Sequence, residues 1–262
     1  MDLGLSDRCY LVTGGSRGLG LATATSLLAE GASVVIGARD EAVLDAAVSR
    51  LALGSPGRVV GVATDLADPN SAERIAAAAV ARFGRLDGAL VSSGGPPSGG
   101  VLDTSDSTWR DAFESVFLGA LRVVRATASA IQPDSAVDGS GGSIALVLST
   151  SARQVFEGLS LSNGLRPGLA MLVKDLGDEL GPRGIRVNGL VPGRIATERT
   201  AALDARSGAP DAVRRRSEGS IPLGRYGEPE EFGRVATFVL SPAASYVNGT
   251  LIAVDGGVLR LP

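Results

Sequence analysis

The sequence predicts a doubly wound α/β fold, in which a parallel sheet carries helices on both faces. Apolar segments of strand length alternate with helical patterns along the chain, and a glycine-rich loop joins the first such strand to the first helix. Several strands are continuous apolar runs, such as residues 144–148 (IALVL), which suit a parallel sheet buried on both faces. We therefore expect a seven-stranded parallel sheet flanked by helices in a single domain, residues 1–262.

The elements follow from local patterns. The expected strands span residues 8–13, 32–37, 58–63, 87–91, 142–148, 185–190 and 250–254. Two long helical patterns, residues 107–130 and 165–180, carry apolar stripes that should face the sheet. The stripes comprise Phe113, Phe117, Ala120, Leu121 and Val124 in the first helix, and Leu169, Leu172, Val173 and Leu176 in the second. Glycine-rich composition predicts loops at residues 94–100 and 138–142.

Composition excludes several classes of function. The chain has 25 basic and 28 acidic residues, a net charge of −3, and no charge cluster typical of nucleic-acid or anionic-lipid binding. We expect a cytoplasmic protein without membrane contact, because no signal segment or membrane-length apolar run is present. Cys9 is the only cysteine and histidine is absent, so we expect a buried, inert thiol and no metal site. Proton chemistry must use other groups.

The strongest chemical motif is the loop at residues 13–20 (TGGSRGLG). Its first and third glycines after the strand allow a tight turn close to a pyrophosphate, and the last permits close helix packing. A strand precedes the loop, a helix follows it, and a second strand arrives about twenty residues later, as a dinucleotide-binding βαβ unit requires. We expect the first-turn amides to face the anion. The binding residues would be Gly14, Ser16, Arg17, Gly18, Leu19 and Gly20.

Further motifs follow in order along nearly the whole chain. They are Asp65-Leu66 and residues 91–95 (VSSGG), 181–188 (GPRGIRVN), 192–197 (PGRIAT), 221–225 (IPLGR) and 255–257 (DGG). In kind, order and spacing they resemble the short-chain dehydrogenase/reductase family, especially its 3-oxoacyl-ACP-reductase-like members. The resemblance implies a Rossmann-type domain that binds a nicotinamide cofactor and interconverts carbonyl compounds and alcohols.

The resemblance also implies further roles. It assigns to the cofactor Asp65 and Leu66 at the adenine ring, Ser93 and Gly94 after the fourth strand, and Pro192, Gly193, Ile195 and Thr197 around the nicotinamide carboxamide. Residues 197–220 correspond to a variable substrate lid. The two long helices correspond to a subunit interface, so a homodimer or homotetramer is expected.

The end of the second strand bears on the choice of cofactor. An acidic residue there would bind the adenosine ribose and repel a 2′-phosphate, but the chain has Ala38 followed by Arg39. The resemblance places Arg17 next to the same ribose, so two guanidiniums would be available to bind the extra phosphate. We therefore expect NADP (NADPH) rather than NAD, although Arg39 alone is also compatible with a solvated strand end.

The family's catalytic serine, tyrosine, lysine and asparagine are largely replaced. Alignment on residues 184–188 (GIRVN) places Ser149 at the serine position, Ser162 at the tyrosine position and Arg166 at the lysine position, while Val116 stands where the asparagine would be. The chemistry needs a phenol that donates a proton to the carbonyl oxygen, and an ammonium that lowers the pKa of the phenol and holds the ribose. Three of the four catalytic positions therefore carry a residue other than the one typical of the family.

No shifted alignment restores the phenol, because no tyrosine lies between residues 149 and 166. Serine is a far weaker acid and a shorter side chain than tyrosine, and a guanidinium suits binding better than proton transfer. Ser149, Ser162 and Arg166 remain the catalytic candidates, with Arg166 also a candidate for the cofactor ribose. Ser149 either hydrogen-bonds a substrate oxygen or caps the backbone.

Arginines are frequent near the predicted cleft. Arg153, Arg166 and Arg194 follow the carboxyl ends of strands five and six, where they would favour an anionic ligand. The expected lid adds Arg199, Arg206, Arg214, Arg215 and Arg216. These residues form either a solvated helix face or a site for a carboxylate or an acyl group linked to phosphopantetheine or coenzyme A.

Three functions are compatible with these features. An NADP-dependent oxidoreductase, in which water, Ser149 or the substrate supplies the proton, explains the cofactor motifs. An NADP-binding sensor or assembly subunit without turnover explains the lost catalytic residues equally well, whereas a lyase using Arg166 and Ser149 has no positive feature. We favour the oxidoreductase with a small-molecule substrate, because Ile195 and Thr197 would aim a hydride donor at the cleft.

Overall fold

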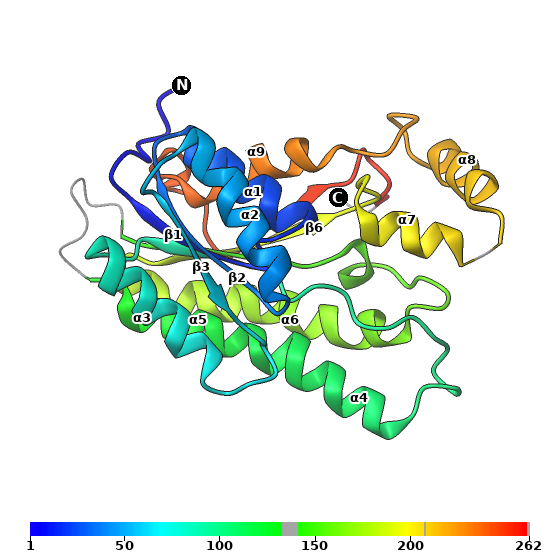
Figure 1. The fold of residues 1–262 in the computed structure, drawn as a ribbon. Coiled ribbons are helices and arrows are strands. Elements are labelled where there is room, and N and C mark those ends of the chain that lie inside the picture. The colour runs from blue at the N-terminus through cyan, green and yellow to red at the C-terminus, as the bar shows by residue number, and fades with distance from the viewer. Residues whose placement is uncertain (133–140, 207, 261–262) are drawn as a thin grey trace.

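The computed structural model describes residues 1–132, 141–206 and 208–260 and contains a seven-stranded, fully parallel sheet (Figure 1). The strand order is β3-β2-β1-β4-β5-β6-β7. The strands are β1 Cys9–Thr13, β2 Ser33–Ala38, β3 Val59–Ala63, β4 Gly88–Val91, β5 Ser143–Val147, β6 Arg186–Pro192 and β7 Leu251–Val254. The predicted fold and all seven strands are confirmed. Residues 138–140 of the second predicted loop lie outside the described residues.

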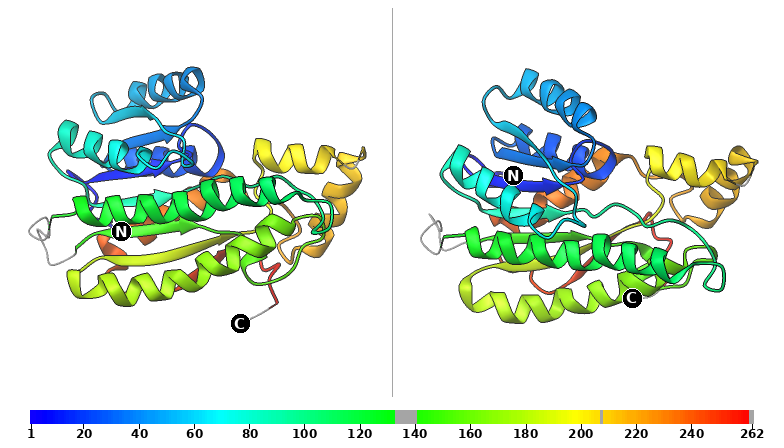
Figure 2. Two further views of the ribbon diagram at one scale, coloured as in Figure 1. Left: turned by 90° about the horizontal axis from the view of Figure 1, so that it is seen from below. Right: turned by 60° about the horizontal axis from the view of Figure 1, so that its bottom comes forward.

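Helices cover both faces of the sheet. One face carries α1 Gly18–Ala29, α2 Glu41–Gly54 and α9 Pro229–Leu240, and the other carries α3 Ser71–Phe83, α4 Asp106–Ala112, α5 Gly119–Ala130 and α6 Ser160–Leu180. Single turns are η1 Phe113–Leu118, η3 Thr150–Ala152, η4 Gly181–Arg183 and η5 Pro242–Ala244. Helices α7 Glu198–Ala205 and α8 Pro210–Ser220 project beyond the carboxyl ends of the strands, as Figure 2 shows.

The central strands bury both of their faces. Cys9 and Leu11 of β1 pack in the core beneath α3, α5 and α6, whereas Tyr10 and Val12 pack in the core beneath α1, α2 and α9. Successive side chains of a strand point to opposite faces, so each core receives every second residue. This two-sided burial explains the continuous apolar runs in the sequence.

The long helical pattern at residues 107–130 is not one uniform helix. Helix α4 passes through the π-helical turn η1 into α5. The wider turn rotates the apolar stripe, so Phe113 is 42% exposed and stacks on Phe117 at a centroid distance of 5.0 Å instead of facing the sheet. Ala120 and Val124 are buried as predicted.

Helix α6 begins at Ser160, five residues before the predicted start. Gly164 and Pro167 are poor helix formers and concealed its first turns. The structure gives Gly164 and its neighbour Gly168 a packing role, because a Cβ at these positions would lie 2.8 Å from the Trp109 ring and 2.9 Å from the Phe117 ring. The glycines therefore let α6 approach α4 and η1 closely.

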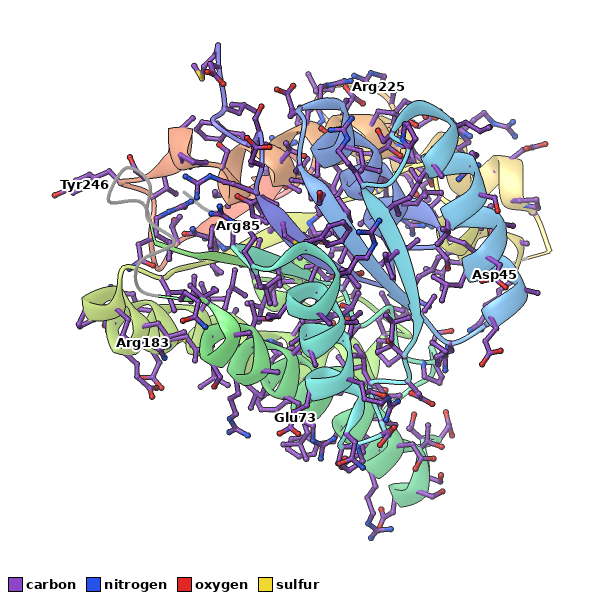
Figure 3. The ribbon with its side chains drawn as sticks, turned by 60° about the vertical axis from the view of Figure 1, so that its left-hand side comes forward. Asp45, Glu73, Arg85, Arg183, Arg225 and Tyr246 are labelled. Carbon is purple, nitrogen blue, oxygen red and sulfur yellow. The ribbon has the colours of Figure 1, made fainter. Side chains whose placement is uncertain are left out.

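A buried carboxylate ties the amino ends of the central strands together. Asp87 is 2% exposed and accepts hydrogen bonds from the backbone N–H of Cys9 at 2.8 Å and from the Arg85 guanidinium at 2.6 and 2.8 Å (Figure 3). Arg8 lies 3.5 Å from the same carboxylate. Two cations and a backbone amide thus stabilise one buried anion.

We expect Asp87→Ala to lower the free energy of unfolding by about 3–5 kcal/mol. The reason is that Arg8 and Arg85, at the amino ends of the central strands, would lose the buried carboxylate that they share. The exposed pair of Asp106 and Arg110, 3.4 Å apart, provides a control, and Asp106→Ala should cost less than about 1 kcal/mol. Urea unfolding followed by circular dichroism measures both changes. Equal losses would contradict this role of Asp87.

The single thiol should be inert in the folded protein. Burial and, to a lesser extent, the charge of Asp87 raise the pKa of Cys9 to about 12. Because the thiolate is the reactive form, we expect no reaction with an aromatic disulfide reagent near about pH 8, and reaction of the thiol once guanidinium chloride unfolds the chain. Equal reaction rates in the two states would disprove the prediction.

Candidate active site

The glycine loop lies where the topology of the sheet reverses. Strands β1 and β4 are neighbours, and the helices that follow them cover opposite faces. In open α/β sheets this arrangement forms the ligand-binding crevice at the carboxyl ends of the strands. Gly14 and Gly18 have positive φ values of 60° and 51°. A Cβ at Gly20 would overlap the backbone of Gly14. These glycines therefore allow the tight turn and close helix packing that the sequence predicts.

The first turn of α1 is open to an anion. No side chain caps its amino end, and no acidic residue lies in its first turn. Its free N–H groups and the positive end of the helix dipole can bind a phosphate. The Ser16 side chain is half-buried and Arg17 is exposed beside this turn. The residues present therefore fit a pyrophosphate.

The neighbouring strand end is fixed by a residue that sequence analysis missed. The Thr13 hydroxyl donates to the Ser92 carbonyl at 3.1 Å and accepts from the Ser92 N–H at 2.8 Å. It thereby braces the backbone that follows β4. Ser93 is half-buried, and Gly94 is exposed with a φ of 70° and no atom within 4 Å of a Cβ placed on it. Gly94 thus borders open space beside the glycine loop.

Thr197 lies opposite the glycine loop. Its hydroxyl caps α7 by accepting from the Thr200 N–H at 3.3 Å, and its methyl carbon would lie 3.5 Å from a Cβ on Gly18. Ile195, 5% exposed, forms a backbone bridge with Gly227. The structure therefore brings the predicted pyrophosphate and nicotinamide regions together across the crevice.

The remaining predicted cofactor residues lie around the same edge of the sheet. Pro192 ends β6, and the Gly193 N–H donates to the Val254 carbonyl at 3.0 Å. Leu66 packs against the core, whereas the exposed Asp65 carboxylate accepts from the Ala67 N–H at 3.0 Å.

The two arginines expected at the ribose have different environments. Arg17 pairs with Glu198 of α7 at 3.2 Å, and both side chains are largely exposed. Arg39 is exposed and makes no ion pair or hydrogen bond with any residue that the structure describes. Within the described residues, Arg39 therefore has no partner, whereas Arg17 has an acidic one.

At Ser149, the structure shows the backbone cap that was one of the two expected roles. The Ser149 hydroxyl caps η3 by accepting from the Ser151 N–H at 3.1 Å, which leaves its own proton available for donation. Ser162 Oγ lies 2.7 Å from Ser151 Oγ. Ser151 is 2% exposed and was missed by sequence analysis, because no family motif marks this position. Ser151 joins the two predicted serines into one polar group.

Arg166 lies inside the protein rather than at the cleft mouth. It is 5% exposed, and its guanidinium donates to the Val147 carbonyl at 2.6 Å and to the Gly94 carbonyl. Burial, with the nearby charge of Arg199, lowers the pKa of Arg166 to about 10, so it remains protonated at neutral pH. Val116 is buried and apolar, so the asparagine position offers no polar group.

No tyrosine from elsewhere replaces the missing phenol. Tyr10 is buried at the start of β1 and its hydroxyl donates to the Leu240 carbonyl at 3.3 Å. Tyr246 is fully exposed and points away from the molecule (Figure 3). Tyr226 donates to Asp204 at 3.0 Å.

The arginines expected at the cleft do not form one cluster, because each has different partners. Arg194 is neutralised by Asp204 at 2.6 Å, and Arg153 donates to the Leu251 carbonyl at 3.5 Å. Within the segment expected to form a lid, Arg214 pairs with Glu218 at 2.8 Å and lies over the Tyr226 ring, whereas Arg206, Arg215 and Arg216 are exposed. Arg199 instead donates to the Gly95 and Pro96 carbonyls at 3.0 and 2.9 Å.

The sheet order, the open α1 terminus and the crevice define an α/β protein of the Rossmann type. The chain belongs to the short-chain dehydrogenase/reductase family, because the family model described as enoyl-(acyl carrier protein) reductase matches residues 14–259 and relatives match almost the whole chain. An uncharacterised oxidoreductase of Mycobacterium tuberculosis is 32% identical over 97% of this chain and 93% of its own. L-rhamnose 1-dehydrogenase (NAD(P)(+)) of Azotobacter vinelandii is 34% identical over 97% of both chains.

Solved structures show the same likeness. L-sorbose reductase from Gluconobacter frateurii, complexed with NADPH and L-sorbose, has a TM-score of 0.93 at 28% identity and covers 100% of both chains. An NADPH-bound short-chain oxidoreductase from Pseudomonas aeruginosa, described as containing an atypical catalytic center, has a TM-score of 0.89 at 30% identity and covers 99% of both chains. Within the described residues, no helix has the length and apolar character needed to cross a membrane.

Asp204 should hold α7 in place, because it accepts from both Arg194 and Tyr226, which lie outside this helix. We expect Asp204→Ala to accelerate tryptic cleavage within residues 198–220 several-fold, since local opening exposes the backbone to protease. Asp211→Asn, which removes an exposed carboxylate from the neighbouring helix α8, should have little effect. Identical cleavage rates for Asp204→Ala and the unmodified protein would exclude this role.

Proposed function

We propose that the protein is an NADP-dependent oxidoreductase of a divergent short-chain dehydrogenase/reductase subgroup that interconverts a carbonyl compound and an alcohol. The observation that carries the proposal is the retained cofactor crevice, with the open end of α1 facing Thr197 across Gly18. The family relationship and the NADPH-bound structural neighbours support it.

The preference for NADP over NAD rests on charge. The end of β2 carries Ala38 rather than an acidic residue that would repel a 2′-phosphate, and Asp40 is engaged in capping α2 through the Val43 N–H at 3.1 Å. The exposed Arg39 has no competing partner among the described residues. Arg17 would exchange Glu198 for the phosphate, because a surface ion pair contributes only about 0–1 kcal/mol. Charge-assisted bonds to a phosphate are stronger.

The altered catalytic centre would work through binding and solvent. Bound NADPH would supply hydride, and the free proton of Ser149 would hydrogen-bond the substrate oxygen. Ser162 and Ser151 would hold water that supplies the proton, since a serine hydroxyl is a much weaker acid than a phenol. Arg166 would contribute a fixed positive charge near the developing oxyanion.

A non-catalytic NADP sensor or assembly subunit is the second candidate. The specific observation in its favour is that all three lost groups are replaced by side chains unsuited to proton transfer. Val116 is buried, Arg166 is engaged with two carbonyls, and the Ser162 hydroxyl lies against Ser151. Such a site binds a cofactor without requiring turnover.

We further propose one domain, with residues 197–220 as a lid over the crevice, a cytoplasmic location and a homodimer or homotetramer. Helices α7 and α8 stand beyond the sheet where a lid is required. The exposed Phe113 and Met171, 42% and 75% accessible, lie on η1 and α6, next to the expected subunit interface. Covering them with a second subunit would bury apolar surface.

The decisive experiment follows NADPH consumption with a panel of ketones, aldehydes and acyl thioesters. Turnover by the unmodified protein above the buffer rate supports the oxidoreductase. A double variant, Ser162→Tyr with Arg166→Lys, restores the family's phenol and ammonium and provides the comparison. Activity of the double variant alone would instead favour the sensor.

The cofactor preference can be tested by direct binding. We expect Arg39→Gln to weaken NADPH binding about tenfold, because one charge-assisted contact of roughly 1.5 kcal/mol is lost, and to leave NADH binding unchanged. Fluorescence titration measures both dissociation constants. Arg50→Gln removes an exposed arginine from α2 and serves as the control. Parallel weakening of NADPH and NADH binding would refute 2′-phosphate recognition by Arg39.

A further inference from the structure

Two arginines bind three consecutive carbonyl groups beside the crevice. Arg166 of α6 donates to Gly94, whereas Arg199 of α7 donates to Gly95 at 3.0 Å and to Pro96 at 2.9 Å. The loop that follows β4 therefore lies between a buried cation and a cation on the lid segment. Side chains from two helices on either side of β6 in the chain thus meet at this loop.

These two guanidiniums lack an anionic partner. Within the described residues, no carboxylate lies within ion-pair distance of Arg166 or Arg199, whereas Arg17, Arg194 and Arg214 each have one. Burial and the charge of Arg206 lower the pKa of Arg199, just as Arg199 lowers that of Arg166. Backbone carbonyl dipoles and, at the exposed Arg199, solvent thus oppose the repulsion between these cations.

Both side chains retain hydrogen-bonding capacity. A guanidinium has five N–H donors, and the carbonyl groups use only part of this set. Arg166 Nε is buried without a hydrogen-bond partner. An unsatisfied buried donor is unfavourable, so an acceptor supplied by a ligand would be stabilising. Gly94, whose carbonyl accepts from Arg166, is exposed, and no atom lies within 4 Å of a Cβ placed on it.

We propose that Arg166 and Arg199 together bind a carboxylate of the substrate, so that the protein acts on an oxo acid or a hydroxy acid. This inference rests on the proposed oxidoreductase function and names its substrate class. A carboxylate has two oxygen atoms in one plane, which matches donation from two planar guanidiniums. Because Arg199 belongs to the lid segment and Arg166 to α6, the anion would also hold the lid against the crevice.

A substitution at Gly95 can displace the Arg199 side chain without changing the charge of the protein. A Cβ on Gly95 would overlap the Arg199 guanidinium. Gly95 has no positive φ, so alanine is compatible with its backbone. Gly95→Ala should therefore displace the guanidinium while leaving the net charge unchanged.

The test compares acetoacetate with its neutral methyl ester in calorimetric titrations of the full chain, with and without NADPH. We expect the unmodified protein to bind acetoacetate about tenfold more tightly than the ester, as loss of one charged contact predicts. Arg199→Gln and Gly95→Ala should both abolish the difference. Arg215→Gln removes an exposed arginine from the neighbouring helix and should preserve it.

Equal binding of the acid and the ester by the unmodified protein would overturn the inference, as would an unchanged preference in Arg199→Gln. If Arg215→Gln lost the preference for the acid as fully as Arg199→Gln, the inference would also be overturned, because the preference would then depend on the overall positive charge of this region. Circular dichroism verifies that each variant is folded. Preference for the acid without NADPH oxidation would support the carboxylate site but contradict the proposed turnover, so the two failures are distinguishable.

Discussion

The parallel pairing of β1 with β4 is the constraint on which the crevice depends. Tyr10, Leu11 and Val12 pair in register with Gly88, Ala89 and Leu90, and all are buried between two helical layers. A shift in this register would misalign the buried side chains, so the strands end at fixed positions. The glycine loop and the Gly94 loop therefore face each other, and the two hydrogen bonds between Thr13 and Ser92 lock the pair.

Arg166 and the serines that precede it determine the charge and the hydrogen bonding at the crevice. A lysine at position 166 would present a mobile ammonium, whereas Arg166 links the end of β5 to the loop that follows β4. One helical turn before Arg166, the Ser162 hydroxyl lies 2.7 Å from that of Ser151. These two small hydroxyl groups and the buried cation of Arg166 are the reason why a bound anion is central to the proposed function.

Sequence patterns predicted the sheet well because burial on both faces leaves an apolar run that few other structures produce. They were less accurate for helices whose shape depends on distant contacts. Phe113 belongs to the predicted stripe, yet the π-turn exposes it. Gly164 reads as a helix breaker, although its lack of a side chain admits the Trp109 ring and keeps α6 intact. Local propensity carries no information about such partners.

The sequence by itself determined the fold, the glycine cradle and the absence of a tyrosine between residues 149 and 166, because each is a property of residue type and order. Only the tertiary structure decided which arginines carry unbalanced charge. Arg194 and Arg199 are only five residues apart in the chain. Folding pairs Arg194 with Asp204, which also accepts from Tyr226, but places Arg199 against two backbone carbonyl groups. Electrostatic balance depends on distances in space, which residue spacing along the chain does not specify.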